Sequence, residues 1–208
     1  MTDIKQMPFA EKLRNIQTYE KSIRSYTISL VKDELGKEKL EELKTLWNKN
    51  IRPIPSEGTD EEKYEVAYKN YLQTWVTAHD FMARYQGDFG KAKLMRVAIN
   101  SMKKKASTSS TLLAKTTMTI APKVSFQTMA KELAYRLQVF SPFTVDQLDK
   151  NQMVLTLTPC KIASISPDFC NVACQNIIRA WLESQFNIKM ISTPKGTNCT
   201  VKIMPFTS

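Results

Sequence analysis

The residues best suited to chemistry are four cysteines in the last third of the chain, Cys160, Cys170, Cys174 and Cys199. Cysteine thiolates are nucleophiles and metal ligands, and three or four of them around one point could hold a zinc ion. Their spacing, C-x9-C-x3-C-x24-C, lacks the paired C-x2-C motifs from which a zinc site is recognised. Zinc is therefore one alternative for this cluster, beside thiol reactivity and simple packing.

The neighbours of two cysteines predict different roles for them. Ser166-Pro167-Asp168 has the form of a helix start, so Cys170 falls in a first turn, where unpaired backbone N–H groups favour the thiolate. Cys170 is accordingly the candidate nucleophile if the protein is a cysteine-dependent enzyme. Cys174 shares a helix face with Ile177 and Trp181, and we expect it to pack as a small buried hydrophobe.

The elements expected around these cysteines form a β-α-β-β unit. Residues 152–159 have the period-two pattern of a strand that ends beside the first cysteine, and a helix follows it. Two further strands are expected at 188–192 and 199–206, joined by a turn. A strand-helix-strand crossover returns its second strand parallel to the first. At least three of the four sulfurs should therefore meet at one edge of a small mixed sheet.

The N-terminal half is expected to be helical. An apolar stripe predicts a long helix that ends at Gly36 and a second helix that ends near residue 50. A capping box at Thr59-Asp60-Glu61-Glu62 opens a strongly amphipathic stretch that runs to Gly87, and a fourth helix is expected to end near Ala106.

The fold class predicted from these elements is α+β, with a helical N-terminal half packed on the C-terminal sheet. The helical region is expected at residues 1–106 and the α/β region, with the cysteines, at residues 107–208. The two regions could also form one integrated domain. Residues 112–121 fit either a strand or a helix extension, and an amphipathic helix is expected from about Ser125 to Phe140.

His79 is the single histidine of the chain, which limits acid–base chemistry and excludes a histidine-rich metal site. It shares a stripe with Leu72, Trp75 and Met82, so a half-buried structural role is the default, and Asp80 should point to another helix face. The alternative is that His79 and Trp75 line a pocket, since the methionine and aromatic side chains of this half could surround a hydrophobic ligand.

The formal charge of +10 and the pI near 9.4 bring nucleic acid and anionic surfaces into consideration as partners. The segment 91–105 contains no acidic residue, and Lys103, Lys104 and Lys105 are its candidate anion-binding residues. No aromatic side chains alternate with these lysines as base-stacking platforms would require. A solvated basic helix face is the alternative interpretation.

The composition also bears on compartment and cofactors. The chain has no run of about eighteen apolar residues and no apolar secretory signal at its N-terminus, so we expect a cytoplasmic protein without a transmembrane segment. Four cysteines in that compartment are more naturally thiols or metal ligands than disulfides. Glycine-rich phosphate loops are absent, and nucleotide-dependent chemistry is not expected.

Two segments near the C-terminus carry a family resemblance, Cys170-Asn171-Val172-Ala173-Cys174 and Asn198-Cys199-Thr200-Val201-Lys202-Ile203. With a cysteine opening a helix and a cysteine opening the last strand, the chain from about Val154 to Phe206 resembles the end of the 4-vinyl reductase domain, a family of small hydrocarbon-binding modules. It is also similar to the thiazoline-carboxylate hydrolases, in which a helical half precedes a cysteine-bearing end. The resemblance implies a ligand or metal role for Cys170 and Cys199.

The sequence leads to three hypotheses on function. The first is a binding module for a small hydrophobic molecule, a cofactor or a metal, with Cys160, Cys170 and Cys199 at the edge of its pocket. The second is an enzyme that uses Cys170 as its nucleophile. The third is association with nucleic acid or an anionic surface through the basic helix.

Overall fold

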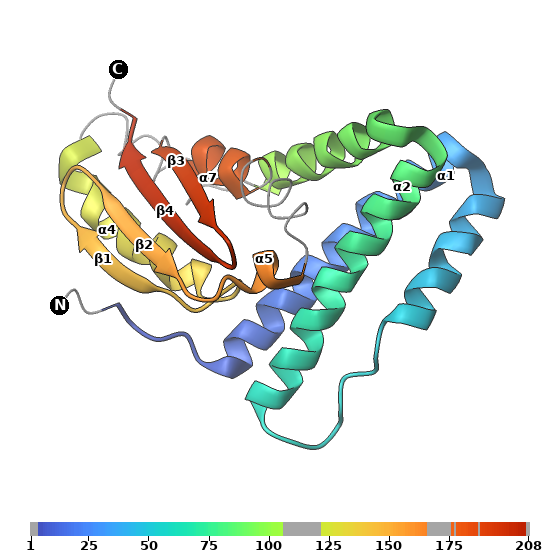
Figure 1. Ribbon diagram of the computed structural model, residues 1–208, viewed down its shortest axis with the longest axis horizontal. Coiled ribbons are helices and arrows are strands. Elements are labelled where there is room, and N and C mark those ends of the chain that lie inside the picture. The colour runs from blue at the N-terminus through green and yellow to red at the C-terminus, as the bar shows by residue number, and fades with distance from the viewer. Residues whose placement is uncertain (1–3, 106–121, 166–175, 177, 187, 207–208) are drawn as a thin grey trace. The chain divides into compact units, whose positions relative to one another are not determined.

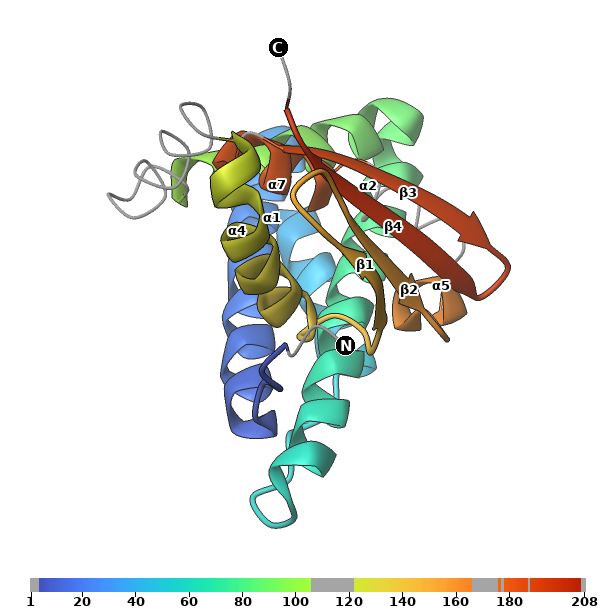
Figure 2. The ribbon, with the colours of Figure 1, turned by 90° about the vertical axis from the view of Figure 1, so that its left-hand side faces the viewer.

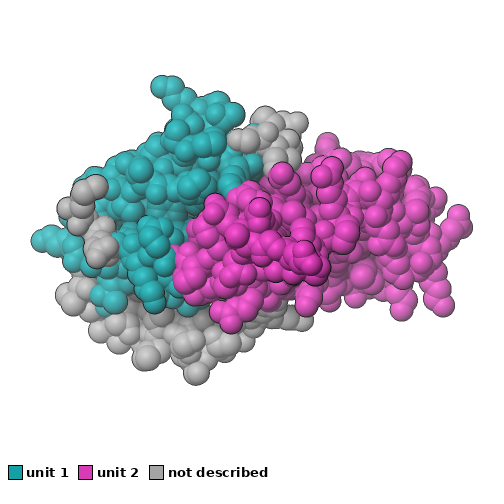
Figure 3. All heavy atoms as spheres, turned by 90° about the horizontal axis from the view of Figure 1, so that it is seen from below, with its two compact units in different colours: residues 1–6, 99–208 teal, residues 7–98 magenta. Residues whose placement is uncertain are grey.

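The computed structural model describes residues 4–105, 122–165, 176, 178–186 and 188–206 (Figure 1). The chain divides into two compact units, coloured separately in Figure 3. We call residues 7–98 the helical unit and residues 1–6 with 99–208 the α/β unit. The protein is α+β, as the sequence predicts, and none of the helices within the described ranges is long and apolar enough to cross a membrane.

Two long helices, α1 (Phe9–Asn50) and α2 (Asp60–Lys105), make up the helical unit, and each is kinked at a glycine. Gly36 has a φ of 86° and Gly87 a φ of 58°, a left-handed region that glycine adopts without a steric penalty. The backbone is not helical at either glycine, so α1 and α2 each consist of two helical segments that meet there, and the predicted helix ends at these two positions are confirmed.

Side chains fix the start of α2 and the loop before it. The backbone N–H of Thr59 donates to Glu62 Oε2 (2.8 Å) and the N–H of Glu62 donates to Thr59 Oγ1 (3.3 Å), which confirms the predicted capping box. The buried amide of Asn70 accepts from the N–H of Arg52 (3.0 Å) and donates to its carbonyl oxygen (2.7 Å). The loop between the helices is thus attached to α2.

Large aromatic and aliphatic side chains fill the core of the helical unit. The indole Nε1 of Trp47 donates to the backbone oxygen of Thr74 (3.2 Å), so this buried donor is satisfied. The largest fully buried residues of the unit come from both helices: Ile16, Leu43, Trp47, Tyr68, Leu72, Phe81, Met82 and Leu94.

The α/β unit contains a four-stranded sheet in the order β1-β2-β4-β3. Its strands are β1 (Thr144–Leu148), β2 (Met153–Leu157), β3 (Ile188–Lys195) and β4 (Asn198–Pro205), and all three pairings are antiparallel. The expectation of a mixed sheet was wrong. β2 and β3 do run in the same direction, as the crossover rule requires, but β4 lies between them and pairs with both.

Helices α4 (Pro122–Leu137), α5 (Lys161–Ile165) and α7 (Arg179–Phe186) complete this unit. α4 covers one face of the sheet (Figure 2), and α7 lies against β3. The predicted amphipathic helix beyond residue 122 is confirmed, as is the end of the last helix at Phe186. Residues 112–121 and the predicted start of that last helix lie outside the described residues.

The two faces of the sheet differ in burial, because successive side chains of a strand point to opposite faces. Met153, Leu155, Met190, Val201 and Ile203 are buried on one face. The alternating positions on the other face are exposed or half-buried and include Lys189, Ile191, Lys202 and Met204.

Candidate functional site

Two of the four cysteines, Cys160 and Cys199, lie at the same end of the sheet. Cys199 opens β4 opposite Leu157, and the backbone N–H of Cys160 donates to the backbone oxygen of Thr197 (2.7 Å). Both cysteine side chains are buried. Cys160 and Cys199 therefore lie at the same end of the sheet, but the predicted cluster of three or more sulfurs is not found among the described residues.

The other two cysteines, Cys170 and Cys174, lie outside the described residues. Within the described part of the chain, no group of three or more histidine, cysteine, aspartate or glutamate side chains is arranged to hold a metal ion. The zinc site and the nucleophilic role of Cys170 stay predictions.

Cys160 forms part of the wall of a small apolar cavity inside the α/β unit. The cavity has a volume of about 40 Å³. Among the described lining residues Ser141 is the one with a hydroxyl group, and its Oγ donates to the oxygen of Pro159 (3.4 Å) and accepts from the N–H of Lys161 (3.3 Å). The remaining lining residues are apolar: Leu137, Phe140, Phe143, Leu155, Leu157, Ile162, Ile178, Met190 and Val201.

A second, larger hollow opens to the surface beside the edge strand β3. This groove has a volume of about 440 Å³ and is lined by residues of α7, β3 and the end of β4: Arg179, Glu183, Lys189, Met190, Ile191, Ser192 and Phe206. Its size falls in the range of about 300–1,000 Å³ that is usual for small-molecule sites. Ile191 and Phe206 are 41% and 54% exposed, so the groove presents apolar surface to solvent.

Charged side chains line the same groove. Glu183 Oε1 accepts from the backbone N–H of Met190 (3.2 Å), and Glu183 Oε2 lies 3.8 Å from Arg179 Nε. Lys189 makes no ion pair with any residue in the described ranges. The groove thus combines two cationic side chains and one carboxylate with exposed apolar surface.

Trp75 and His79, the predicted ligand-contacting residues of the helical half, belong to the helical unit. Trp75 is buried and its ring lies 5.9 Å from that of Tyr26. The His79 side chain is 18% exposed, and its Nδ1 lies 3.3 Å from Asp80 Oδ1. Asp80 is 68% exposed and so lies on a more exposed face of the helix than His79, as expected, although the two side chains are in contact at the surface. A ligand role for Trp75 and His79 stays a prediction.

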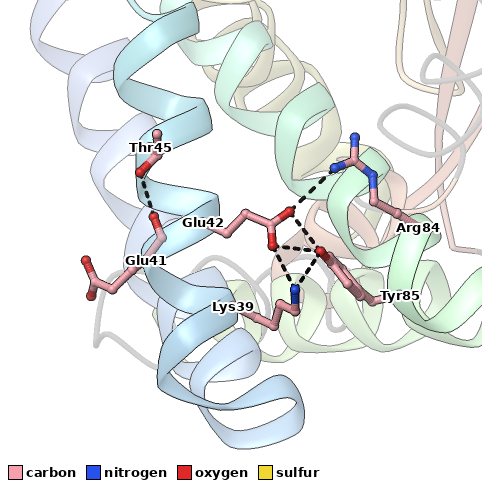
Figure 4. A network of polar contacts seen from close by, with 6 residues as sticks. All are labelled: Lys39, Glu41, Glu42, Thr45, Arg84 and Tyr85. Carbon is pink, nitrogen blue, oxygen red and sulfur yellow. Dashed lines mark hydrogen bonds and ion pairs between the residues drawn. The ribbon is translucent and has the colours of Figure 1, made fainter.

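The densest polar cluster of the helical unit surrounds Glu42 (Figure 4). Its carboxylate accepts from Tyr85 Oη (2.7 and 2.8 Å) and from Lys39 Nζ (3.0 Å), and Arg84 Nη1 lies 3.6 Å away. The hydrogen bonds from Tyr85 and then Lys39 lower the pKa of Glu42, and the contacts with Tyr85 and Glu42 raise the pKa of Lys39. These groups satisfy one another and connect α1 to α2, which is a structural role.

The basic segment of α2 is partly neutralised by acids. Lys91 Nζ lies 3.0 Å from Asp88 Oδ1, and Lys93 forms an ion pair with Glu34 of α1. The hydrogen bond from Lys93 lowers the pKa of Glu34. The side chains of Lys103, Lys104 and Lys105 lie outside the described residues, and their binding to nucleic acid or an anionic surface stays a prediction.

Sequence reasoning missed the groove residues Arg179, Glu183 and Phe206. The strand predicted at 188–192 is confirmed as part of β3. The groove also requires that β3 is an edge strand, which follows from strand order and not from any local pattern.

Comparison of the chain with models of known families, with curated proteins and with solved structures finds no match. The resemblance to the 4-vinyl reductase domain and to the thiazoline-carboxylate hydrolases therefore stays a prediction. The function of the chain has to be inferred from the residues that line its cavity and its groove.

Proposed function

We propose that the α/β unit binds the apolar part of a small molecule in the cavity between its sheet and helix α4. The observation that carries this proposal is an internal space with almost entirely apolar walls, at the sheet end where Cys160 lies. Cys160 contributes its side chain to the wall in this proposal. The hydrocarbon-binding function that the sequence resemblance implies is of the same kind.

The size and polarity of the cavity favour an apolar occupant over water. A water molecule needs about 10–15 Å³ and two to four polar partners, and the walls offer almost none. A hydrocarbon group would instead gain dispersion contacts with side chains that face empty space. At about 40 Å³ the cavity is much smaller than the roughly 150 Å³ that accepts benzene, so a longer chain requires a wall residue to move.

A flexible wall residue is present. Met190 has an unbranched side chain with several rotatable bonds, and methionine adapts to irregular spaces more readily than leucine or isoleucine. Its side chain is buried on the cavity side of β3. The cavity can therefore enlarge at Met190 without a shift of the backbone.

Calorimetric titration of the 208-residue protein with 1-octanol tests the proposal against the alternative that the space is a packing imperfection. Val201→Phe should fill the cavity, and Val201→Leu should fill part of it. Such enlargements of a core side chain typically lower the free energy of unfolding by about 1–3 kcal/mol, which a folded protein can tolerate. We expect wild-type binding to weaken in Val201→Leu and to disappear in Val201→Phe.

The matched control is Val154→Phe, because Val154 lies on the other face of the same sheet and is half-buried there. We expect this variant to bind 1-octanol as wild type does. Circular dichroism verifies that each variant is folded. Absence of binding in wild type, or equal binding in folded Val201→Phe, would refute the proposed function.

A further inference from the structure

We infer that the ligand is an amphipathic carboxylate whose head group lies in the groove beside β3 and whose apolar chain passes Met190 into the cavity. This inference rests on the proposed function and adds the chemical class of the ligand. It also assigns a site to the groove between α7 and the edge strand, with Arg179 as the residue that binds the head group.

The groove and the cavity share one lining residue. Met190 lines both of them. Ile178 lines the cavity and the next residue, Arg179, lines the groove. In this proposal a rotation of the Met190 side chain joins the two spaces into one elongated site that is apolar inside and charged at its mouth.

The charge of the groove selects an anionic head group. Among the described lining residues, Arg179 and Lys189 bring two positive charges, against the one carboxylate of Glu183. One oxygen of Glu183 already accepts the N–H of Met190, and the distance of 3.8 Å from the other oxygen to Arg179 Nε is too long for a hydrogen bond. Arg179 can thus take a carboxylate in the paired geometry that a guanidinium favours.

The exposed apolar residues of the groove fit the first part of a hydrocarbon chain. Ile191 and Phe206 are large and exposed, although most residues of their type are buried in folded proteins. A ligand chain that leaves the head-group site along these side chains removes apolar surface from water on both partners.

Addition of a peptide strand to the edge of the sheet is a less suitable use of this surface. The N–H of Met190 points away from β4 and is already bound by Glu183, so the outward positions of β3 are the alternate residues 188, 190, 192 and 194. Residue 194 is a proline and has no N–H. Two of these four outward donors are occupied or missing, so a docking strand could form only half of the donor contacts along this edge.

Paired titrations with octanoate and 1-octanol separate the head-group site from the cavity. We compare wild type with Arg179→Gln, which removes the charge and keeps a polar side chain. We expect octanoate affinity to fall by at least about tenfold in Arg179→Gln, because the paired charge-assisted hydrogen bonds to the carboxylate are lost. The affinity for 1-octanol should stay the same. Arg136→Gln is the matched control, since Arg136 forms a similar exposed pair with Glu132 on α4.

Each outcome decides between the two proposals. Unchanged octanoate affinity in Arg179→Gln, with 1-octanol still bound, would overturn the head-group site and leave the proposed function intact. Failure of both ligands to bind wild type would overturn both. Nuclear Overhauser contacts from the terminal methyl of labelled octanoate to Leu155 and Val201 would support entry of the chain, and contacts to Ile191 and Phe206 alone would overturn it.

Discussion

The helical unit and the α/β unit use their polar side chains in opposite ways. In the helical unit, hydrogen bonds join Lys39 and Glu42 of α1 to Tyr85 of α2. Thr59 and Glu62 of the capping box likewise bond to each other. In the α/β unit, Arg179 and Lys189 lie at a groove beside exposed apolar residues. Satisfied polar groups stabilise a scaffold, whereas incompletely matched groups beside a hollow are available to a ligand.

The largest effect is expected from truncation of the residue shared by the cavity and the groove. Met190→Ala should destabilise the protein by about 2–5 kcal/mol, because it enlarges an existing cavity in the core of the α/β unit. Added 1-decanol should restore part of that stability by filling the space. Urea unfolding with and without the alcohol measures both effects.

Met204→Ala is the control for this truncation, since Met204 lies half-buried on the opposite face of the same sheet. We expect a smaller loss of stability and no recovery with 1-decanol. Equal recovery in the two variants would mean that the alcohol does not act through the cavity.

In the helical unit, removal of the buried, hydrogen-bonded amide of Asn70 should destabilise the protein. Asn70→Ala removes both hydrogen bonds to the backbone of Arg52, so the N–H and C=O of Arg52 must bond to water instead. This change should lower the free energy of unfolding by about 1–3 kcal/mol. Gln73→Ala removes a half-buried amide one turn further along and should cost less. Similar unfolding midpoints for the two variants would show that Asn70 does not hold the loop.

Two buried threonines of the helical unit should respond in opposite directions to removal of the hydroxyl group. Thr27 Oγ1 is buried with no hydrogen-bond partner among the residues described, whereas Thr74 Oγ1 bonds to Glu20 Oε1 (3.3 Å). Thr27→Val should therefore stabilise the protein by up to about 1 kcal/mol and Thr74→Val should destabilise it. Thermal unfolding of both variants is the test, and destabilisation by Thr27→Val would contradict it.

The smallest expected effect is the acid sensitivity of the Glu42 cluster. The pKa of Glu42 is lowered in the folded protein. The cluster therefore makes its full contribution to the stability of the fold at pH values above the ordinary glutamate pKa of about 4.3. This contribution is lost as the pH falls through the lowered pKa. Between pH 6 and pH 3, wild type should lose more stability than Glu42→Gln.

The stability that Tyr85→Phe loses between pH 6 and pH 3 should lie between the losses of wild type and Glu42→Gln. This variant removes the largest cause of the lowered Glu42 pKa and leaves Lys39 and Arg84 in place. Urea unfolding at several pH values measures the difference. Identical pH dependence in all three proteins would exclude the cluster as a source of acid sensitivity.

Local signals were enough to predict most of the helical unit. Gly36 and Gly87 mark the kinks, Thr59 and Glu62 form the capping box, and the apolar stripe with Trp75 is buried. Each of these features depends on residues close in sequence. The contact between Lys93 and Glu34 could not be predicted in this way, because it joins two helices.

The α/β unit was predicted less completely because its site depends on strand pairing. The strands at β2, β3 and β4 were expected, but the antiparallel order and the edge position of β3 follow from β4 inserting between β2 and β3. β1 was missed although a turn at Asp149 follows it, where Oδ1 accepts the N–H groups of Asn151 and Gln152. The groove residues became neighbours only through this arrangement.

Methyl NMR of the 208-residue protein during titration with 1-octanol tests most directly whether the cavity is a binding site. We predict chemical-shift changes at methyls of the cavity wall, such as those of Leu155, Ile162 and Val201, with methyls of the helical unit such as Leu43 and Leu72 unchanged. Changes confined to the helical unit, or none at the cavity wall at saturating alcohol, would contradict a binding site between the sheet and α4.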